Sequence, residues 1–240
     1  PVKQPKLDAW EKFVTKVKSK KAKKVEIAII GKYFGTGDYQ LRDSYAALFD
    51  AIDHAGWYEG IEVVTRWVDA ERVEKEGAEA LVGAPDGIIV PIGWGVRGAE
   101  GMIAAASYAR KNKIPYLGLC YGMQLAVTAY ARDMLGWKDA NTTENDPDTK
   151  HPIVHIIPQQ QEFMAKRAYG GTMRLGSWDA IVKKDSMAYE LYKEFGDFKD
   201  ESKGLTSERH RHRYEFNNDF AADLENKGLV ISARSVAEDL

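Results

Sequence analysis

The chain has 240 residues, of which 44% are hydrophobic and 29% charged, and its formal net charge is −2. This length and composition suit one sizeable domain with a hydrophobic core or, as the alternative, two small ones. The near-neutral charge excludes nucleic acid and anionic membrane as expected main partners, and no run approaches the roughly 18 apolar residues of a membrane span. The single cysteine excludes an internal disulfide and a thiolate zinc cage, and the start has no signal-peptide pattern. We therefore expect a cytoplasmic protein.

Lysine dominates the segment "KFVTKVKSKKAKK", residues 12–24, which has seven lysines and no acidic residue. A basic arm for nucleic acid would have this composition, and so would the solvated end of a helix before a strand. Because the rest of the chain is not basic, we favour the solvated helix end. Residues 1–24 are interpreted as a linker with an N-terminal helix, and residues 25–240 as the main domain.

Apolar runs and helical spacing alternate along the first half of the chain. Strands are predicted at 25–31, 61–68, 86–93 and 114–120. Helices are predicted after Asp43, at 100–112 and after Cys120. The helix after Asp43 places Tyr45, Leu48, Phe49 and Ile52 on one face and closes at Gly56; the helix after Cys120 does so with Met123, Ala126, Val127, Tyr130 and Met134.

The second half is less regular. It contains a predicted strand at 177–182, a short helix from Ser186 and a strand at 228–233. Alternation of strand and helix predicts an α/β fold with a mostly parallel sheet flanked by helices on both faces. Ligands bind such sheets at the carboxyl ends of the strands. The strand ends near Gly93 and Cys120 should therefore open onto the same edge.

The only cysteine lies in "GLCYG", between an apolar strand and a helix. Glycines at 118 and 122 permit close backbone approach in a sharp turn, which is the geometry of a nucleophile elbow. The following helix directs its N–H groups at the sulfur, which favours a thiolate and can stabilise an oxyanion. A small buried cysteine is the alternative that this short pattern leaves open.

The segment "GLCYGMQ" resembles the nucleophile motif G-x-C-x-G-x-Q of the class I (triad-type) glutamine amidotransferases. Further segments are similar to those of the CTP synthase family, in its C-terminal glutaminase domain: "GKY" (31–33), "VPIGWGVRGAEG" (90–101), "ANTTENDPDT" (140–149), "GGTMRLG" (170–176) and "ERHRHRYEFNN" (208–218). The resemblance runs from near residue 25 to near 233. It implies a flavodoxin-like fold with the elbow after a central strand.

The resemblance also implies roles for individual residues. Cys120 would be the nucleophile, and the backbone N–H groups of Gly93 and Tyr121 would form the oxyanion hole. The residues implied to bind L-glutamine are Gly93, Tyr121, Gly122, Met123, Gln124, Glu144 and Arg213. An acid for the ammonium and an arginine for the carboxylate suit a free amino acid. This chain has Ile92 and Trp94 where the family usually has glycine and phenylalanine.

The family completes its catalytic triad with His and Glu in an F-H-P-E motif that this sequence does not contain. We expect the chain to stop before that segment, so no base is named. The five histidines, at 54, 151, 155, 210 and 212, lie in segments that do not match it. His210 and His212 would lie on one side of a strand, but no third ligand is evident and no metal site is expected.

By this resemblance the domain would hydrolyse glutamine through a cysteine thioester and supply ammonia for the ATP-dependent amination of UTP to CTP by a synthetase domain. ATP and Mg²⁺ would belong to that absent domain, since no G-x-x-x-x-G-K-[ST] loop is present here. GTP would activate the full enzyme, which would be a homo-oligomer. Two alternatives remain open: a stand-alone hydrolase or chaperone-like relative with a cysteine elbow, and a decayed, non-catalytic amidotransferase-like assembly module.

Overall fold

The computed structural model describes residues 6–19, 21, 23–36, 39–168 and 171–237. The chain folds into two compact units. The first comprises Pro1–Gly93 and Arg97–Met123, and the second comprises Trp94–Val96 and Gln124–Leu240. The chain therefore passes between the units three times.

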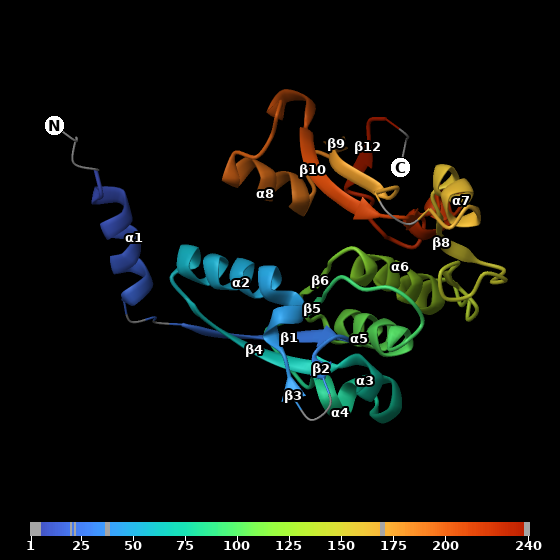
Figure 1. Cartoon of the computed structure of the whole chain (residues 1–240), viewed down its shortest axis with the longest axis horizontal. Coiled ribbons are helices and arrows are strands. Elements are labelled where there is room, and N and C mark those ends of the chain that lie inside the picture. Colours follow the sequence, from blue (N-terminus) through green and yellow to red (C-terminus); the bar gives the residue numbers. More distant parts are fainter. Residues whose placement is uncertain (1–5, 20, 22, 37–38, 169–170, 238–240) are drawn as a thin grey trace. The chain divides into compact units, whose positions relative to one another are not determined.

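A four-stranded parallel sheet forms the centre of the first unit (Figure 1). Its order is β4 (Glu62–Asp69), β1 (Lys24–Gly31), β5 (Gly87–Val90) and β6 (Tyr116–Gly118). β1 is nearly continuous in hydrophobic residues because it is covered on both faces, as parallel strands usually are. The sheet confirms the predicted α/β fold with a parallel sheet.

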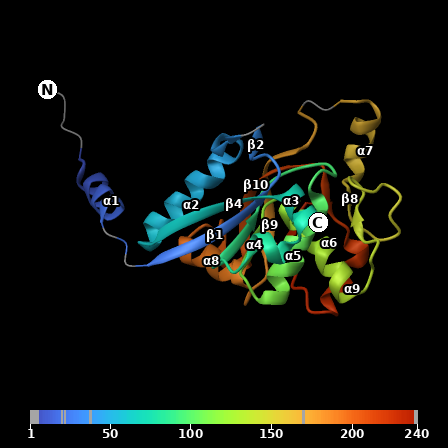
Figure 2. The same cartoon turned by 90° about the horizontal axis from the view of Figure 1, so that it is seen from below.

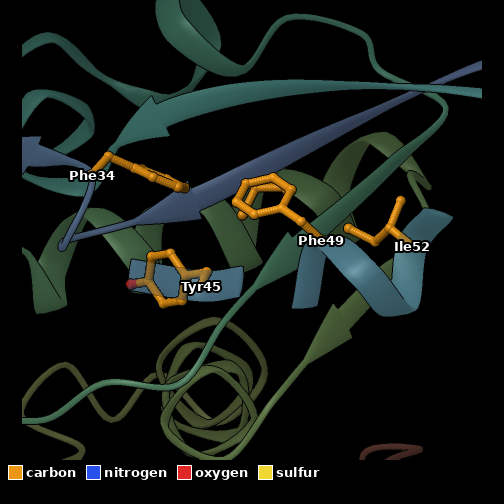
Figure 3. Close-up of a cluster of buried hydrophobic side chains, with 5 residues drawn as sticks. Phe34, Tyr45, Phe49 and Ile52 are labelled. Atoms are coloured by element: carbon orange, nitrogen blue, oxygen red, sulfur yellow. The ribbon is translucent and has the colours of Figure 1, made fainter. Parts of the chain in front are cut away.

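Helices cover both faces of this sheet. Figure 1 shows α2 (Ala46–Glu59) on one face and α3 (Ala70–Glu76), α4 (Ala78–Val82) and α5 (Ala99–Asn112) on the other. Beneath α2, a buried cluster joins β1 to that helix, and Figure 3 shows its aromatic rings. Its members are Ile29, Phe34, Tyr45, Phe49 and Ile52. The helix face predicted after Asp43 is thus the face that packs on the sheet.

The end of α2 differs from the prediction. Gly56 lies inside the helix, and Gly60 ends it in the left-handed conformation with φ 71°. A Cβ at Gly56 would lie 3.0 Å from Val63 Cγ2, so this glycine permits close helix–strand packing. The prediction that Gly56 closes the helix was therefore wrong, because this glycine lets the helix pack closely on the strand and does not cap it.

The remaining elements of the first unit come before α2 in the sequence. Helix α1 (Asp8–Lys18) contacts α2 through a ring pair between Phe13 and Trp57, with centroids 5.9 Å apart. In Figure 2, α1 lies beyond the start of β1. The short pair β2 (Gly35–Thr36) and β3 (Tyr39–Gln40) and the 3₁₀ turn η1 (Arg42–Tyr45) lead into α2.

Helix α6 (Tyr121–Met134) begins in the first unit and continues into the second. The predicted helix is present, and its most buried residues lie beside the predicted apolar face. Its buried residues include Gln124, Leu125, Thr128 and Ala131, whereas Met123 is 41% exposed. Val127 and Tyr130 of the predicted face are partly buried and pack against a core cluster. The buried Thr128 satisfies its hydroxyl by donating to Gln124 O at 3.0 Å.

Two three-stranded sheets form the second unit. One is antiparallel, in the order β10 (Leu205–His212), β9 (Arg174–Val182) and β12 (Ala233–Ser235). The other has the order β11 (Tyr214–Phe216), β8 (Pro152–Ile156) and β7 (Asn141–Thr142). The helices and 3₁₀ turns of this unit are α7 (Pro158–Ala165), α8 (Met187–Phe195), η2 (Glu201–Lys203), η3 (Asn218–Phe220) and α9 (Ala221–Glu225).

Two further details correct the sequence analysis. The strand predicted at 228–233 begins only at Ala233 and forms β12, because pairing with β9 starts there, opposite Val182. Within the described four-stranded sheet, β6 is the terminal strand, whereas the elbow was expected after a central one. The next strands along the chain, β7 and β8, pair with each other instead.

Among the described residues, no helix has the length and apolarity needed to cross a membrane.

Candidate active site

Cys120 occupies the turn between β6 and α6 with a positive φ of 52°. An L-residue in this left-handed region costs of order 1–3 kcal/mol, and such strain gathers at functional sites. The residue is exposed and forms no disulfide. The cysteine is therefore held out at the tip of a strained strand-to-helix turn, as a nucleophile elbow requires.

Both flanking glycines are required by close backbone contacts. A Cβ on Gly118 would lie 2.5 Å from Met123 N, and one on Gly122 would lie 2.0 Å from Val90 O. No side chain tolerates either distance without a backbone shift. The two glycines thus bring the first turn of α6 directly against β5 and fix the direction in which Cys120 points.

Hydrogen bonds hold the same turn. Leu119 N donates to Val90 O at 2.9 Å, Gly122 N donates to Leu119 O at 3.0 Å, and Met123 N donates to Cys120 O at 3.1 Å. The N–H groups of Gly122 and Met123 are thus committed to the turn. The role of the Tyr121 amide as an oxyanion donor stays a prediction.

Gly93, the other predicted oxyanion donor, lies beside Tyr121 in the first unit. A Cβ on Gly93 would lie 3.2 Å from Tyr121 Cδ1 and 3.3 Å from Lys32 Cε. β5 and β6 are parallel with Val90 opposite Gly118, so both strand ends reach the same edge, as predicted. Ile92 stands where the family usually has glycine. It is 52% exposed and its φ is not positive, so the backbone at this position does not require glycine.

The buried phenol of Tyr116 supports the elbow from below. Its hydroxyl donates to Gly122 O at 2.9 Å. Burial raises the pKa of Tyr116 well above its ordinary value, so the hydroxyl stays protonated and remains a donor. Sequence analysis gave this tyrosine no role. A tyrosine in an apolar strand does not by itself indicate a supporting role, because its contact with Gly122 O forms only when the turn folds back over the strand.

Gln124, Glu144 and Arg213 belong to the second unit. Gln124 is 4% exposed, and its Nε2 donates to Tyr214 O at 2.9 Å. Tyr214 follows Arg213 directly, so the structure brings Gln124 to the backbone beside the predicted carboxylate-binding arginine. A buried amide with one fixed donor bond keeps a defined orientation, which is what a specific binding group needs.

Arg213 is 8% exposed, and its guanidinium is held by neutral partners. Its Nη1 donates to Gln160 Oε1 at 2.7 Å and to Thr172 Oγ1 at 3.0 Å. These bonds orient the planar guanidinium, whose fork suits a carboxylate. Gln160 and Thr172 were not singled out by sequence analysis, although "GGTMRLG" contains Thr172.

Glu144 is half-buried in the loop after β7. Its Oε1 accepts a hydrogen bond from Gly95 N at 3.0 Å. Gly95 lies in the same glycine-containing loop that follows β5, so the carboxylate is bound to the segment that begins at Trp94. Charge-assisted bonds of this kind orient a carboxylate.

The histidines are engaged in local contacts. His151 Nδ1 lies 2.8 Å from Asp139 Oδ1, and its ring stacks on Trp137. His210 Nδ1 lies 2.9 Å from His212 Nε2, so these two do share one side of β10 as predicted. Burial lowers the pKa of His212 to about 4, which makes it neutral at physiological pH.

The described part of the chain holds no group of three or more His, Cys, Asp or Glu side chains arranged to bind a metal ion.

A protein-family model for class I glutamine amidotransferases matches residues 40–239. The chain is 47% identical over 240 residues to a CTP synthase from Caldanaerobacter subterraneus subsp. tengcongensis, covering 100% of this chain and 41% of that protein. It is 46% identical over 229 residues to a CTP synthase from Pyrococcus abyssi, covering 95% of this chain and 39% of that protein. The chain thus spans about two fifths of the length of these relatives.

A solved structure of similar fold is the glutaminase domain of Trypanosoma brucei CTPS with bound acivicin. Its TM-score is 0.74 at 36% sequence identity, and the match covers 87% of this chain and 74% of that one.

Proposed function

We propose, from the premise that this chain belongs to the class I glutamine amidotransferase family, that it is the glutaminase domain of a CTP synthase. The observation that carries the proposal is the exposed Cys120 at φ 52°, in a turn that two glycines force against β5. A strained, exposed cysteine before a helix is costly for a purely structural role.

In the proposed reaction, the Cys120 thiolate attacks the side-chain amide carbon of glutamine. The C–S bond forms, the carbonyl oxygen takes the negative charge, and the N–H groups of Gly93 and Tyr121 stabilise it. The intermediate collapses, the C–N bond breaks, and the nitrogen leaves as ammonia after taking a proton. Water then hydrolyses the thioester to glutamate and restores the thiol.

Substrate recognition would use the three polar groups of the second unit. Glu144 would bind the ammonium of glutamine, and Arg213 would bind its carboxylate. Gln124 would fix the chain of the substrate, together with the backbone of Gly122 and Met123. The fixed guanidinium of Arg213, bound to two neutral side chains, supports this assignment.

The remaining expectations concern the whole protein. Ammonia would pass to a synthetase domain of the same polypeptide, which would aminate UTP with ATP and Mg²⁺ while GTP activates glutamine hydrolysis. No cofactor is expected in this domain itself. The full enzyme would be a cytoplasmic homo-oligomer with neither nucleic acid nor membrane as a partner.

Covalent labelling tests the proposal. Acivicin, which the Trypanosoma brucei domain binds, should react with this chain, and peptide mass analysis should find the adduct on Cys120. Excess glutamine should protect the thiol, and Cys120→Ala should abolish labelling. Arg213→Ala should weaken inhibitor binding by about 2 to 4 kcal/mol, because a desolvated charge pair loses one partner.

The matched control is Arg209→Ala, which removes an exposed arginine from strand β10, four residues before Arg213, and should leave labelling unchanged. Thermal melting of each variant separates lost binding from lost folding. Labelling that glutamine does not slow would contradict a glutamine pocket. Absence of labelling in the folded chain would favour the decayed assembly module instead.

A further inference from the structure

We propose that Lys32 is a positioning residue, which holds the oxyanion-binding peptide at Gly93 against Tyr121. The expected effect on catalysis rests on the proposed function, whereas the contacts that hold Gly93 in place do not depend on it. The sequence segment "GKY" that contains Lys32 has no role in the reaction described above. All the groups involved lie in the first unit of the chain.

Lys32 directly follows strand β1 and is only 2% exposed. Lysine is rarely buried, because its ammonium loses hydration unless other groups replace the water. Its Nζ donates to Arg97 O at 2.8 Å and lies 4.8 Å from the centroid of the Tyr121 ring. The cation is thus bound by a carbonyl on one side and an aromatic face on the other.

Arg97 returns the contact. Its Nη2 donates to Lys32 O at 2.7 Å, so each residue binds the backbone carbonyl of the other through its side chain. The guanidinium is held in turn by Glu71 at 2.5 Å. Arg97 ends the segment 91–97, which follows β5 and contains Gly93; both Gly93 and Arg97 belong to the first unit. This reciprocal pair therefore fastens one end of the oxyanion segment to the end of β1.

The stem of Lys32 also touches the oxyanion peptide itself. The Cβ that Gly93 lacks would lie 3.3 Å from Lys32 Cε and 3.2 Å from Tyr121 Cδ1. The backbone of Gly93 is thus packed between the lysine stem and the tyrosine ring. Tyr121 is the residue after the nucleophile and is 1% exposed, so its ring cannot turn aside. Loss of the lysine would remove one wall of this packing and the group that binds the ring face.

The expected consequence is a displaced oxyanion donor. Stabilisation of a developing charge depends on donors preset at hydrogen-bond distance, and loss of one such donor costs roughly 10²- to 10³-fold in rate. Misplacement by about 1 Å is enough for a loss of about 10². A positioning role therefore predicts a slower chemical step with little change in substrate binding.

The test compares Lys32→Met with Lys24→Met in the full chain. Methionine keeps the unbranched stem and removes the ammonium. Lys24 lies at the start of the preceding strand β1, is exposed, and forms a surface ion pair with Glu62 at 3.6 Å. Two electrophiles report on Cys120. With acivicin, the C–S bond forms while charge develops on the ring nitrogen before chloride leaves, whereas iodoacetamide reacts by direct displacement and needs no oxyanion donor.

For Lys32→Met, the maximal rate of inactivation by acivicin should fall about 10- to 10²-fold, while its half-saturating concentration changes by less than about threefold. The plateau rate with iodoacetamide, at a pH where the thiol is fully ionised, should stay as in the unaltered chain. Lys24→Met should match the unaltered chain with both reagents. Equal losses with both reagents, or none with either, would overturn the proposal.

Hydrogen–deuterium exchange makes the outcome independent of the glutaminase assignment. The amides of Gly93 and Arg97 should exchange at least about tenfold faster in Lys32→Met than in Lys24→Met, because the ammonium that binds Arg97 O and the face of the Tyr121 ring is lost. Unchanged exchange would overturn the proposal even if acivicin labels no form of the chain. If Lys32→Met does not fold, Lys32→Gln, which stays neutral but polar, takes its place under the same two criteria.

Discussion

Replacement of Cys120 by glycine should give a more stable protein than its replacement by alanine. Both variants lose the thiol, so the comparison isolates the backbone. Cys120 has a φ of 52°, in the left-handed region where a Cβ crowds the backbone. Glycine adopts this region without that crowding.

The magnitude follows from two opposing contributions. A Cβ in the left-handed region costs about 1–2 kcal/mol, and glycine instead costs about 0.4–1 kcal/mol through the greater freedom of the unfolded chain. The free energy of unfolding of Cys120→Gly should therefore exceed that of Cys120→Ala by about 0.5–1 kcal/mol. For a chain of this size, that corresponds to roughly 1–4 °C in melting temperature.

Differential scanning calorimetry of the two variants under identical conditions measures this difference. Ala104→Gly provides the control, because Ala104 lies within helix α5 at an ordinary helical φ. There the change should destabilise by about 1 kcal/mol. If Cys120→Ala is as stable as Cys120→Gly while Ala104→Gly behaves as expected, the strained elbow is not a property of the folded protein.

Three further predictions concern the supporting structure. Gly122→Ala should cost at least about 2 kcal/mol of unfolding free energy in chemical denaturation, since its Cβ would lie 2.0 Å from Val90 O; a cost below about 1 kcal/mol would contradict this. Burial lowers the pKa of His212 to about 4 from its usual 6.5, so its contribution to stability is complete above pH 6.5 and is lost as pH falls towards 4. His212→Asn should reduce the loss between pH 7 and 4.5 by about 2 kcal/mol, and an unchanged pH profile would refute it. Arg174→Met should destabilise by about 3–5 kcal/mol, because it leaves the buried Glu215, 3.8 Å away, without its counter-charge; Arg174→Met and Glu215→Gln together should cost less than the sum of the single changes.

The sequence located the elements that have a strong local signal. Strand β1, predicted at 25–31, spans Lys24–Gly31, and the helix predicted at 100–112 spans Ala99–Asn112. Ser186 caps α8 by accepting a hydrogen bond from Tyr189 N. These features depend on hydrophobic periodicity and on capping, which are properties of neighbouring residues along the chain. The turn at "GLCYG" depends on both kinds of contact, because Gly118 admits Met123 N nearby in the chain whereas Gly122 admits Val90 O of strand β5.

The contacts between segments that are far apart in the sequence could not be predicted from such local patterns. Gly56 was predicted to end the helix, but in the tertiary structure it allows Val63 of the neighbouring strand to pack closely against the helix. The sequence also did not specify which residues of α6 are the most buried. Periodicity indicates that a helix has two faces, whereas the packing of Leu125, Thr128 and Ala131 decides which one is buried.

The sequence alone therefore indicated the proposed nucleophile, its flanking glycines and the polar residues that lie in a family motif. Only the tertiary structure decided which groups support them: Tyr116 beneath the elbow, Gln160 and Thr172 around Arg213, and Lys32 against Gly93. The physical reason is that a side chain's supporting contacts come from segments far away in sequence, such as residues 32 and 97. Local sequence carries no record of those distances, because they arise only when the strands pair and the loops between them close.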